Sequence, residues 1–161
     1  MIRPTHSLVF GALALLAACQ SPGHSAAASK TARQGAAFLA ANEHAAGVQS
    51  VGGIEYKVLT SGPADGPHPT PEDQVVVEYE GRLLNGQVFD ATPAGQPASF
   101  QLGRLIPGWI TAMQLMRPGD EWMIWIPPVL AYGDDDTGPI PGGSTLAFRL
   151  KLVAVNKGNG S

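Results

Sequence analysis

The sequence predicts an α+β fold in which an antiparallel sheet of five to six strands wraps around one short amphipathic helix. Segments in which apolar and polar residues alternate, a pattern typical of half-buried strands, recur between residues 54 and 153. A single stretch, residues 105–116, instead carries apolar residues at helical spacing. Because one amphipathic helix needs one apolar partner, we expect it to pack on the concave face of the sheet.

The first eighteen residues have the composition of a secretory signal peptide, with Arg3 as the positive charge and an apolar run over residues 8–18. This run is too short to cross a bilayer as a helix, which takes about 20 residues. It ends in Leu16-Ala17-Ala18-Cys19, and Cys19 is the only cysteine of the chain. The ending resembles the bacterial lipobox, so we expect cleavage before Cys19 and lipid attachment there. The alternative is ordinary secretion with a free thiol.

The expected signal peptide and the net charge of the chain indicate where the protein is located and which partners it has. Gln20, and not an aspartate, follows Cys19, which by analogy with enteric lipoproteins favours the outer membrane of the bacterial envelope, facing the periplasm. Without residues 1–18 the chain keeps nine Lys or Arg and thirteen Asp or Glu, a net charge of −4. No basic patch stands out, so we expect no nucleic acid and no membrane contact beyond the anchor. The four histidines lie far apart, so no metal site is expected.

Segment composition divides the rest of the chain. Residues 19–30 are rich in Ser, Ala and Gly and predict a flexible tether. Residues 31–50 predict a short N-terminal helix that contains Phe38 and Leu39 and needs packing to persist. A globular domain is expected over residues 51–157, followed by a disordered tail, residues 158–161.

Six segments of the domain predict strands, and the clearest alternation places Val75, Val77 and Leu83 on one face. Asn85-Gly86 marks a tight turn. The strands are expected at residues 54–60, 74–83, 87–91, 98–102, 121–126 and 145–153. In the last two expected strands, the inward-facing residues are Trp122, Ile124, Ile126, Leu146, Phe148, Leu150 and Leu152.

The helical stretch opens at a Pro107-Gly108 corner, directly before Trp109. Its apolar stripe consists of Trp109, Ala112, Met113 and Met116. The segment Arg117-Pro118-Gly119-Asp120 predicts a type II turn that ends the helix, because proline fixes φ and glycine permits a positive φ. Met123 and Trp125 face outward from the next strand. We expect the N-terminal helix to cover them, and a binding surface for unfolded clients is the alternative.

Four blocks of sequence, taken in order, resemble the signature of FKBP-type peptidyl-prolyl cis-trans isomerases: VEYEGRLLNGQVFDAT, PASFQLGRLIPGWITAMQLMRPGDEW, IPPVLAYG and STLAFRLKLVAV. The resemblance runs from about Val51 to Val155, and FLAANE upstream is similar to the Mip-like and periplasmic branch. It implies an FKBP-like half-barrel that isomerises Xaa-Pro bonds in unfolded or partly folded exported proteins without a cofactor. Mip-like relatives dimerise through a long N-terminal helical region, which is short here, so we expect a monomer.

The chemistry of prolyl isomerisation agrees with an apolar site. Rotation about an Xaa-Pro bond faces a barrier of ~18–20 kcal/mol because the twisted amide loses its resonance. The twisted amide is less polar than the planar amide and depends less on water at its oxygen. A water-poor pocket that fits the twisted form better therefore lowers the barrier, and no nucleophile or metal is needed.

The resemblance assigns that pocket to apolar and aromatic residues together with one acid. Trp109 is its floor beneath the proline ring, Ile106 offers a backbone N–H and Tyr132 a hydroxyl. Taken alone, Trp109 fits an ordinary core residue and Asp90 a turn residue, so only the joint pattern indicates a pocket. The full expected set is Tyr79, Phe89, Asp90, Phe100, Leu105, Ile106, Trp109, Tyr132, Ile140 and Phe148.

The loop that overhangs this pocket departs from the family pattern. YGDDDTGPI, which begins at Tyr132, is one residue shorter than in some relatives, and PGGST follows it. Substrate preference and affinity for the macrolide inhibitors that the resemblance implies therefore stay open. Asp134, Asp135 and Asp136 lack the alternating spacing of a calcium loop, so we expect a solvated acidic loop. The alternative function is a binding module or holdase chaperone with little or no turnover.

Overall fold

The computed structural model describes residues 26–158. The expected signal peptide, Cys19, residues 19–25 of the expected tether and residues 159–161 of the expected tail lie outside this range. The helices and strands are α1 (Ala26–Asn42), β1 (Val48–Val51), β2 (Ile54–Thr60), β3 (Gln74–Leu83), β4 (Val88–Ala91), β5 (Ala98–Gln101), η1 (Leu102–Arg104), α2 (Pro107–Met113), β6 (Glu121–Ile126), η2 (Pro128–Leu130) and β7 (Leu146–Asn156).

The strands form one antiparallel sheet in the order β1-β2-β6-β7-β3-β4, and β5 pairs with the other end of β3. The longest pairing joins β3 to β7, from Gln74 opposite Asn156 to Leu83 opposite Leu146. The predicted α+β class is confirmed. The sheet has a seventh strand because β1, which lies in the segment expected to end the N-terminal helix, forms a hairpin with β2. Gly52 and Gly53, both with positive φ, form the turn that this hairpin needs.

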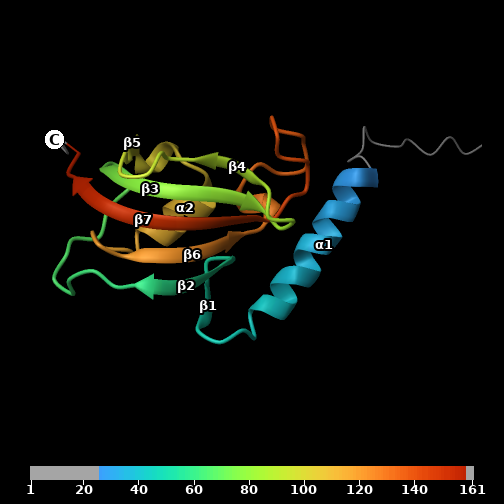
Figure 1. Cartoon of the computed structure of the whole chain (residues 1–161), viewed down its shortest axis with the longest axis horizontal. Coiled ribbons are helices and arrows are strands. Elements are labelled where there is room, and N and C mark those ends of the chain that lie inside the picture. The colour runs from blue at the N-terminus through green and yellow to red at the C-terminus, as the bar shows by residue number, and fades with distance from the viewer. Residues whose placement is uncertain (1–25, 159–161) are drawn as a thin grey trace, which may run out of the picture.

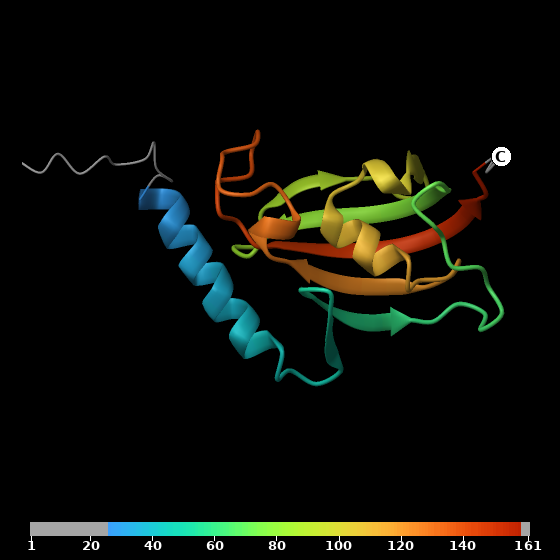
Figure 2. The ribbon, with the colours of Figure 1, turned by 180° about the vertical axis from the view of Figure 1, so that it is seen from behind.

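The curved sheet packs around α2, which crosses its concave face (Figures 1 and 2). The predicted apolar stripe of this helix is buried, and Met116, just beyond its end, is fully enclosed. The inward-facing residues expected on β3, β6 and β7 are buried or half-buried in the same core. The predicted turn after the helix also forms: Gly119 has a φ of +96°, and the Asp120 N–H donates to the Arg117 carbonyl at 2.9 Å.

Helix α1 lies across one end of the sheet (Figure 2). It begins at Ala26, so residues 26–30, expected to be tether, are helical. Alanine is the best helix former, and Ala28 is buried against the domain. The helix covers part of the outward surface of β6, because the rings of Phe38 and Trp125 lie 6.4 Å apart. At its C-terminal end, the Asn42 amide donates to the buried Glu55 carboxylate at 2.7 Å. Within residues 26–158, no helix combines the length and apolarity needed to span a membrane.

A buried carboxylate ties the start of β3 to the end of β7, at one end of this strand pair. Asp73 is 3% exposed and accepts hydrogen bonds from the Thr70 N–H at 2.8 Å and the Gly158 N–H at 3.0 Å. The Lys157 ammonium lies 2.9 Å from the same carboxylate. The Thr70 hydrogen bond, then the Lys157 contact, hold the pKa of Asp73 well below its usual range, so the native state favours the ionised form.

We predict that Asp73→Asn lowers the free energy of unfolding at pH 7, because an uncharged amide cannot replace these bonds. The native pKa lies below the unfolded value of about 3.9, so the stabilisation is complete above that value and is lost as the pH falls through the native pKa. Urea unfolding at a series of pH values should show the gap between wild type and variant narrowing below about pH 4. Asp65→Asn, in an exposed loop, is the control. A gap that does not change with pH would contradict the assignment.

Candidate functional site

Nine of the ten expected side chains surround one cavity of about 170 Å³ on the concave side of the sheet. They come from β3, β4, β5, β7, the first turn of α2, the segment before α2 and the segment after η2. The lining residues are Tyr79, Phe89, Asp90, Phe100, Leu105, Ile106, Trp109, Tyr132 and Phe148. Residues that are up to 69 positions apart in the sequence therefore meet in one hollow.

Trp109 forms the floor of this cavity and is only 5% exposed. Pro107 is the first residue of α2, where its fixed φ suits the helix start, and Trp109 follows within the same turn. The edges of the rings meet at near right angles: the Trp109 centroid lies 5.0 Å from that of Tyr79 and 5.3 Å from that of Phe148. Such edge-to-face contacts are favourable for aromatic rings, so strands β3 and β7 support the orientation of the indole.

The one acid of the cavity is bonded to a wall residue. The Tyr79 hydroxyl donates to the Asp90 carboxylate at 2.6 Å, across the β3/β4 pair. Burial, and then the Asp90 carboxylate, raise the pKa of the Tyr79 hydroxyl well above its ordinary value. The phenol therefore stays protonated at neutral pH. This pairing was not predicted, because only the types of the two residues pointed to it.

Two polar groups at the rim remain available to a ligand. The backbone N–H of Ile106, directly before α2, makes no hydrogen bond within the described part of the chain. Tyr132 is 41% exposed at the cavity, and its hydroxyl likewise has no hydrogen-bond partner among residues 26–158. Burial and the charge of Asp90 raise the pKa of Tyr132, so this hydroxyl is a donor at neutral pH.

Gly81 is a residue of the site that sequence reasoning did not single out. It lies on the inward face of β3, opposite Asp90 of β4. A Cβ atom there would lie 2.6 Å from the Phe89 ring and 2.8 Å from the Phe148 ring, closer than real contacts allow. The missing side chain is thus what lets the two rings, whose centroids are 5.5 Å apart, lie against the strand. A glycine among inward-facing strand residues was the available signal.

The tenth expected residue, Ile140, and the three aspartates of the acidic loop are not among the residues that line the cavity. Ile140 is 6% exposed, belongs to the buried core and does not line the cavity. Its backbone is tied to Thr137 by two hydrogen bonds, which fold the loop back on itself. Of the three aspartates, Asp136 accepts a hydrogen bond from the Gly142 N–H at 2.7 Å. The described residues hold no cluster of His, Cys, Asp or Glu suited to a metal ion.

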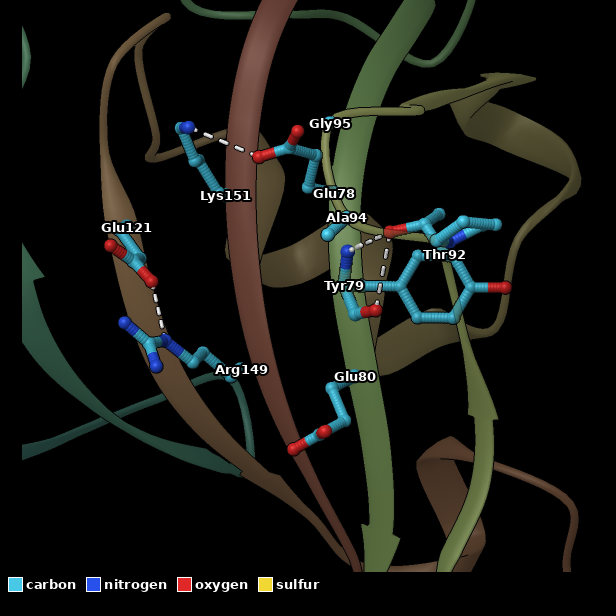
Figure 3. Close-up of a pocket in the computed structure, with 10 residues that line it drawn as sticks. Glu78, Tyr79, Glu80, Thr92, Ala94, Gly95, Glu121, Arg149 and Lys151 are labelled. Carbon is cyan, nitrogen blue, oxygen red and sulfur yellow. Dashed lines mark hydrogen bonds and ion pairs between the residues drawn. The ribbon is translucent and has the colours of Figure 1, made fainter.

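A larger hollow, of about 360 Å³, lies on the opposite, convex face of the sheet (Figure 3). Its walls are charged, and its cations are already paired: Lys151 lies 3.0 Å from Glu78, and Arg149 bonds Glu121. Figure 3 shows the Tyr79 ring directed away from Glu78, and the same residue also lines the concave cavity. Hydrated ion pairs on an open surface do not desolvate an amide, so the concave cavity is the stronger candidate site.

Comparison with known proteins is decisive for the family. A family model described as FKBP-type peptidyl-prolyl cis-trans isomerase matches residues 66–153. The chain belongs to this family. The matched region of the FKBP-type domain holds every residue that lines the concave cavity.

Relatives and solved structures place this FKBP-type chain among bacterial proteins. It is 45% identical over 129 residues to the peptidyl-prolyl cis-trans isomerase Mip of Coxiella burnetii, covering 78% of this chain and 55% of that protein. It is 43% identical over 127 residues to the outer membrane protein MIP of Legionella longbeachae, with 77% and 54% covered. The chain thus spans about half the length of these curated relatives.

Among solved structures, a peptidyl-prolyl cis-trans isomerase from Pseudomonas syringae pv. tomato superimposes with a TM-score of 0.76 at 34% identity. The match covers 84% of this chain and all of that one. FkpA from Escherichia coli gives a TM-score of 0.75, also at 34% identity, covering 80% of this chain and 61% of that one. The fold predicted from the sequence is therefore that of a known FKBP-type architecture.

Gly81→Ala should lower the free energy of unfolding by about 1–3 kcal/mol, because the new methyl group overpacks the Phe89 and Phe148 rings. Urea unfolding measures this directly, and near-ultraviolet circular dichroism should report the displaced rings. Glu80→Ala, the neighbouring position facing the opposite side of the sheet, is the control and should change stability by less than about 1 kcal/mol. Equal effects of the two substitutions would contradict the proposed packing.

Proposed function

We propose that this protein catalyses cis-trans isomerisation of Xaa-Pro bonds in exported proteins of the cell envelope, with the concave cavity as its active site. The observation that carries the proposal is the aromatic cavity itself, with a Trp109 floor held edge to face by Tyr79 and Phe148 and two unpaired donors at its rim. Membership of the family named for this reaction supports it.

In this mechanism the proline ring rests on Trp109, between the Tyr79 and Phe148 rings. Flat aromatic walls bind a saturated ring well and lose little side-chain entropy. The Ile106 N–H and the Tyr132 hydroxyl donate to carbonyl groups of the bound segment and fix its direction. The rotating amide is thereby held away from bulk water, where its planar, more polar form would be best solvated.

Asp90 adds a difference between the planar and the twisted amide. A planar amide carries more negative charge on its oxygen than a twisted amide does, because resonance is lost on twisting. A carboxylate on the wall, fixed by the Tyr79 hydroxyl, therefore disfavours the planar form more. Shortening isomerisation from tens of seconds to milliseconds requires the site to favour the twisted amide over the planar amide by about 5–6 kcal/mol in total.

A protease-coupled assay with an Xaa-Pro peptide tests the proposal, and wild type is expected to accelerate isomerisation. Trp109→Leu should reduce kcat/KM by about tenfold or more, a loss of about 1.4 kcal/mol in transition-state stabilisation. Trp122→Leu is a matched control, since Trp122 is equally buried, at 5%, but lies outside the cavity, stacked on Tyr56. Both should destabilise the fold by similar amounts, less than the about 3–5 kcal/mol typical of truncation to alanine.

Equal kcat/KM losses in the two tryptophan variants would remove the cavity from the mechanism. A wild type that retains binding of unfolded clients but accelerates nothing at micromolar concentration would instead favour the binding-module alternative. A panel of peptides that differ in the residue before proline would define the substrate preference.

We also propose that the protein is a lipoprotein anchored through Cys19. The lipobox-like sequence supports this, as does similarity to a relative named an outer membrane protein. The outer membrane as its location, macrolides as inhibitors and a monomeric state stay predictions.

Radioactive palmitate supplied to cells should label the wild-type protein and leave Cys19→Ser unlabelled. Soluble Cys19→Ser should keep the catalysed rate of the wild-type domain, because the cavity lies in the described residues 79–148. An unlabelled wild type would indicate ordinary secretion.

A further inference from the structure

We propose that Gly35 of α1 is a positioning residue for the cavity: through Thr145 and Gly143, the docked helix fixes the backbone that holds Tyr132 at the rim. The inference rests on the proposed function only in so far as Tyr132 binds substrate. It assigns a role in substrate binding to a helix that contributes no side chain to the cavity.

The first contact is between the helix backbone and Thr145. A Cβ atom added at Gly35 would lie 2.2 Å from Thr145 Oγ1 and 3.0 Å from Thr145 Cβ. Only a glycine lets the helix approach this closely. Thr145 is 2% exposed, and its hydroxyl finds no hydrogen-bond partner within residues 26–158. The side chain therefore meets the helix through van der Waals packing.

The second contact lies two turns earlier in the helix. A Cβ atom at Gly143 would lie 2.4 Å from the Ala28 carbonyl oxygen and 3.2 Å from the Ala32 methyl group. Residues 142–145 are all buried. The segment is thus enclosed between the helix and the domain, and Figure 2 shows the N-terminal half of α1 beside this loop.

Hydrogen bonds carry the constraint from this segment to the rim. The Gly143 N–H donates to the Gly133 carbonyl at 2.9 Å, and the Gly133 N–H donates to the Pro128 carbonyl at 2.8 Å. Tyr132 is the adjacent residue. Because no hydrogen bond within the described chain fixes its hydroxyl, the place of this side chain depends on its backbone, and hence on Gly143.

The helix is held well enough to act as a support. Near its C-terminal end the Phe38 ring packs against Trp125, and Asn42 bonds Glu55. A larger side chain at Gly35 therefore cannot be accommodated by a free rotation of the helix. It has to lift the helix from Thr145 or push Thr145 and its neighbours toward the cavity.

Gly35→Val tests the inference, with Ala36→Val as the matched control, because Ala36 is the next residue and is exposed. Gly35→Val should lower kcat/KM about three- to tenfold, mainly through KM, the loss expected for one misplaced hydrogen bond. Ala36→Val should match wild type. Urea unfolding checks that each variant is folded. If Gly35→Val does not fold, Gly35→Ala, which adds only the clashing Cβ, replaces it in the same comparison.

The same substitution in a Tyr132→Phe background identifies the route. If Gly35 acts through the Tyr132 hydroxyl, the double variant should be no worse than Tyr132→Phe alone. Losses that multiply instead would mean general loosening of the domain and would overturn the proposal. A Gly35→Val variant that is folded and as active as Ala36→Val would overturn it as well.

A measurement independent of activity separates this inference from the proposed function. Amide hydrogen exchange followed by NMR should be faster at Gly143 in Gly35→Val than in Ala36→Val. Unchanged exchange would refute the mechanical link, whatever the kinetics. Faster exchange in a protein that isomerises nothing would instead leave the link in place and refute the catalytic role of the cavity.

Discussion

The contact between α2 and the concave face of the sheet is the constraint on which the rest of the domain depends. A seven-residue helix is far too short to be stable in water by itself, so it persists only because the sheet buries its apolar stripe. The long β3/β7 pair supplies that surface, and the fully buried Met113 and Met116 fill the space beneath it. The same packing sets the direction of Trp109, and so the floor of the cavity.

A hollow in a protein core survives only if its walls cannot collapse into it. Here the walls are rings held edge to face by rings from other elements, so no single side chain can move inward alone. The Tyr79 hydroxyl and the Asp90 carboxylate pair with each other, while the Ile106 N–H and the Tyr132 hydroxyl have no hydrogen-bond partner among residues 26–158. The cavity is therefore lined mainly by aromatic and aliphatic side chains together with a few polar groups, an arrangement typical of ligand sites.

Much of this could be predicted from the sequence, because alternation and helical spacing record which side of an element is buried. The inward faces of β3, β6 and β7 and the stripe of α2 follow that rule, and nine expected cavity residues meet in one place. Strand β1 was missed because it has only four residues, and with both middle residues exposed it shows no alternation. The Gly52-Gly53 pair beside it was the better signal.

Features set by three-dimensional packing were not predictable in the same way. Helix α1 begins five residues before its expected start, and the buried Ala28 in this added turn lies against Gly143, more than a hundred residues away. The depth of Ile140 depends on how its loop closes, and composition does not record this. The closeness of Gly35 to Thr145 is of the same kind, since a glycine within a helix usually signals only a weaker helix.

The edges of the sheet have a consequence for the proposed function, in which the protein meets unfolded chains. An open edge offers unpaired backbone groups to any extended segment, and long open edges recruit such segments into aggregates. The outermost strands here, β1 on one side and β4 with β5 on the other, are each only four residues long. Under the proposed function, a client chain can thus form few ladder bonds at either border and can leave after its proline has isomerised.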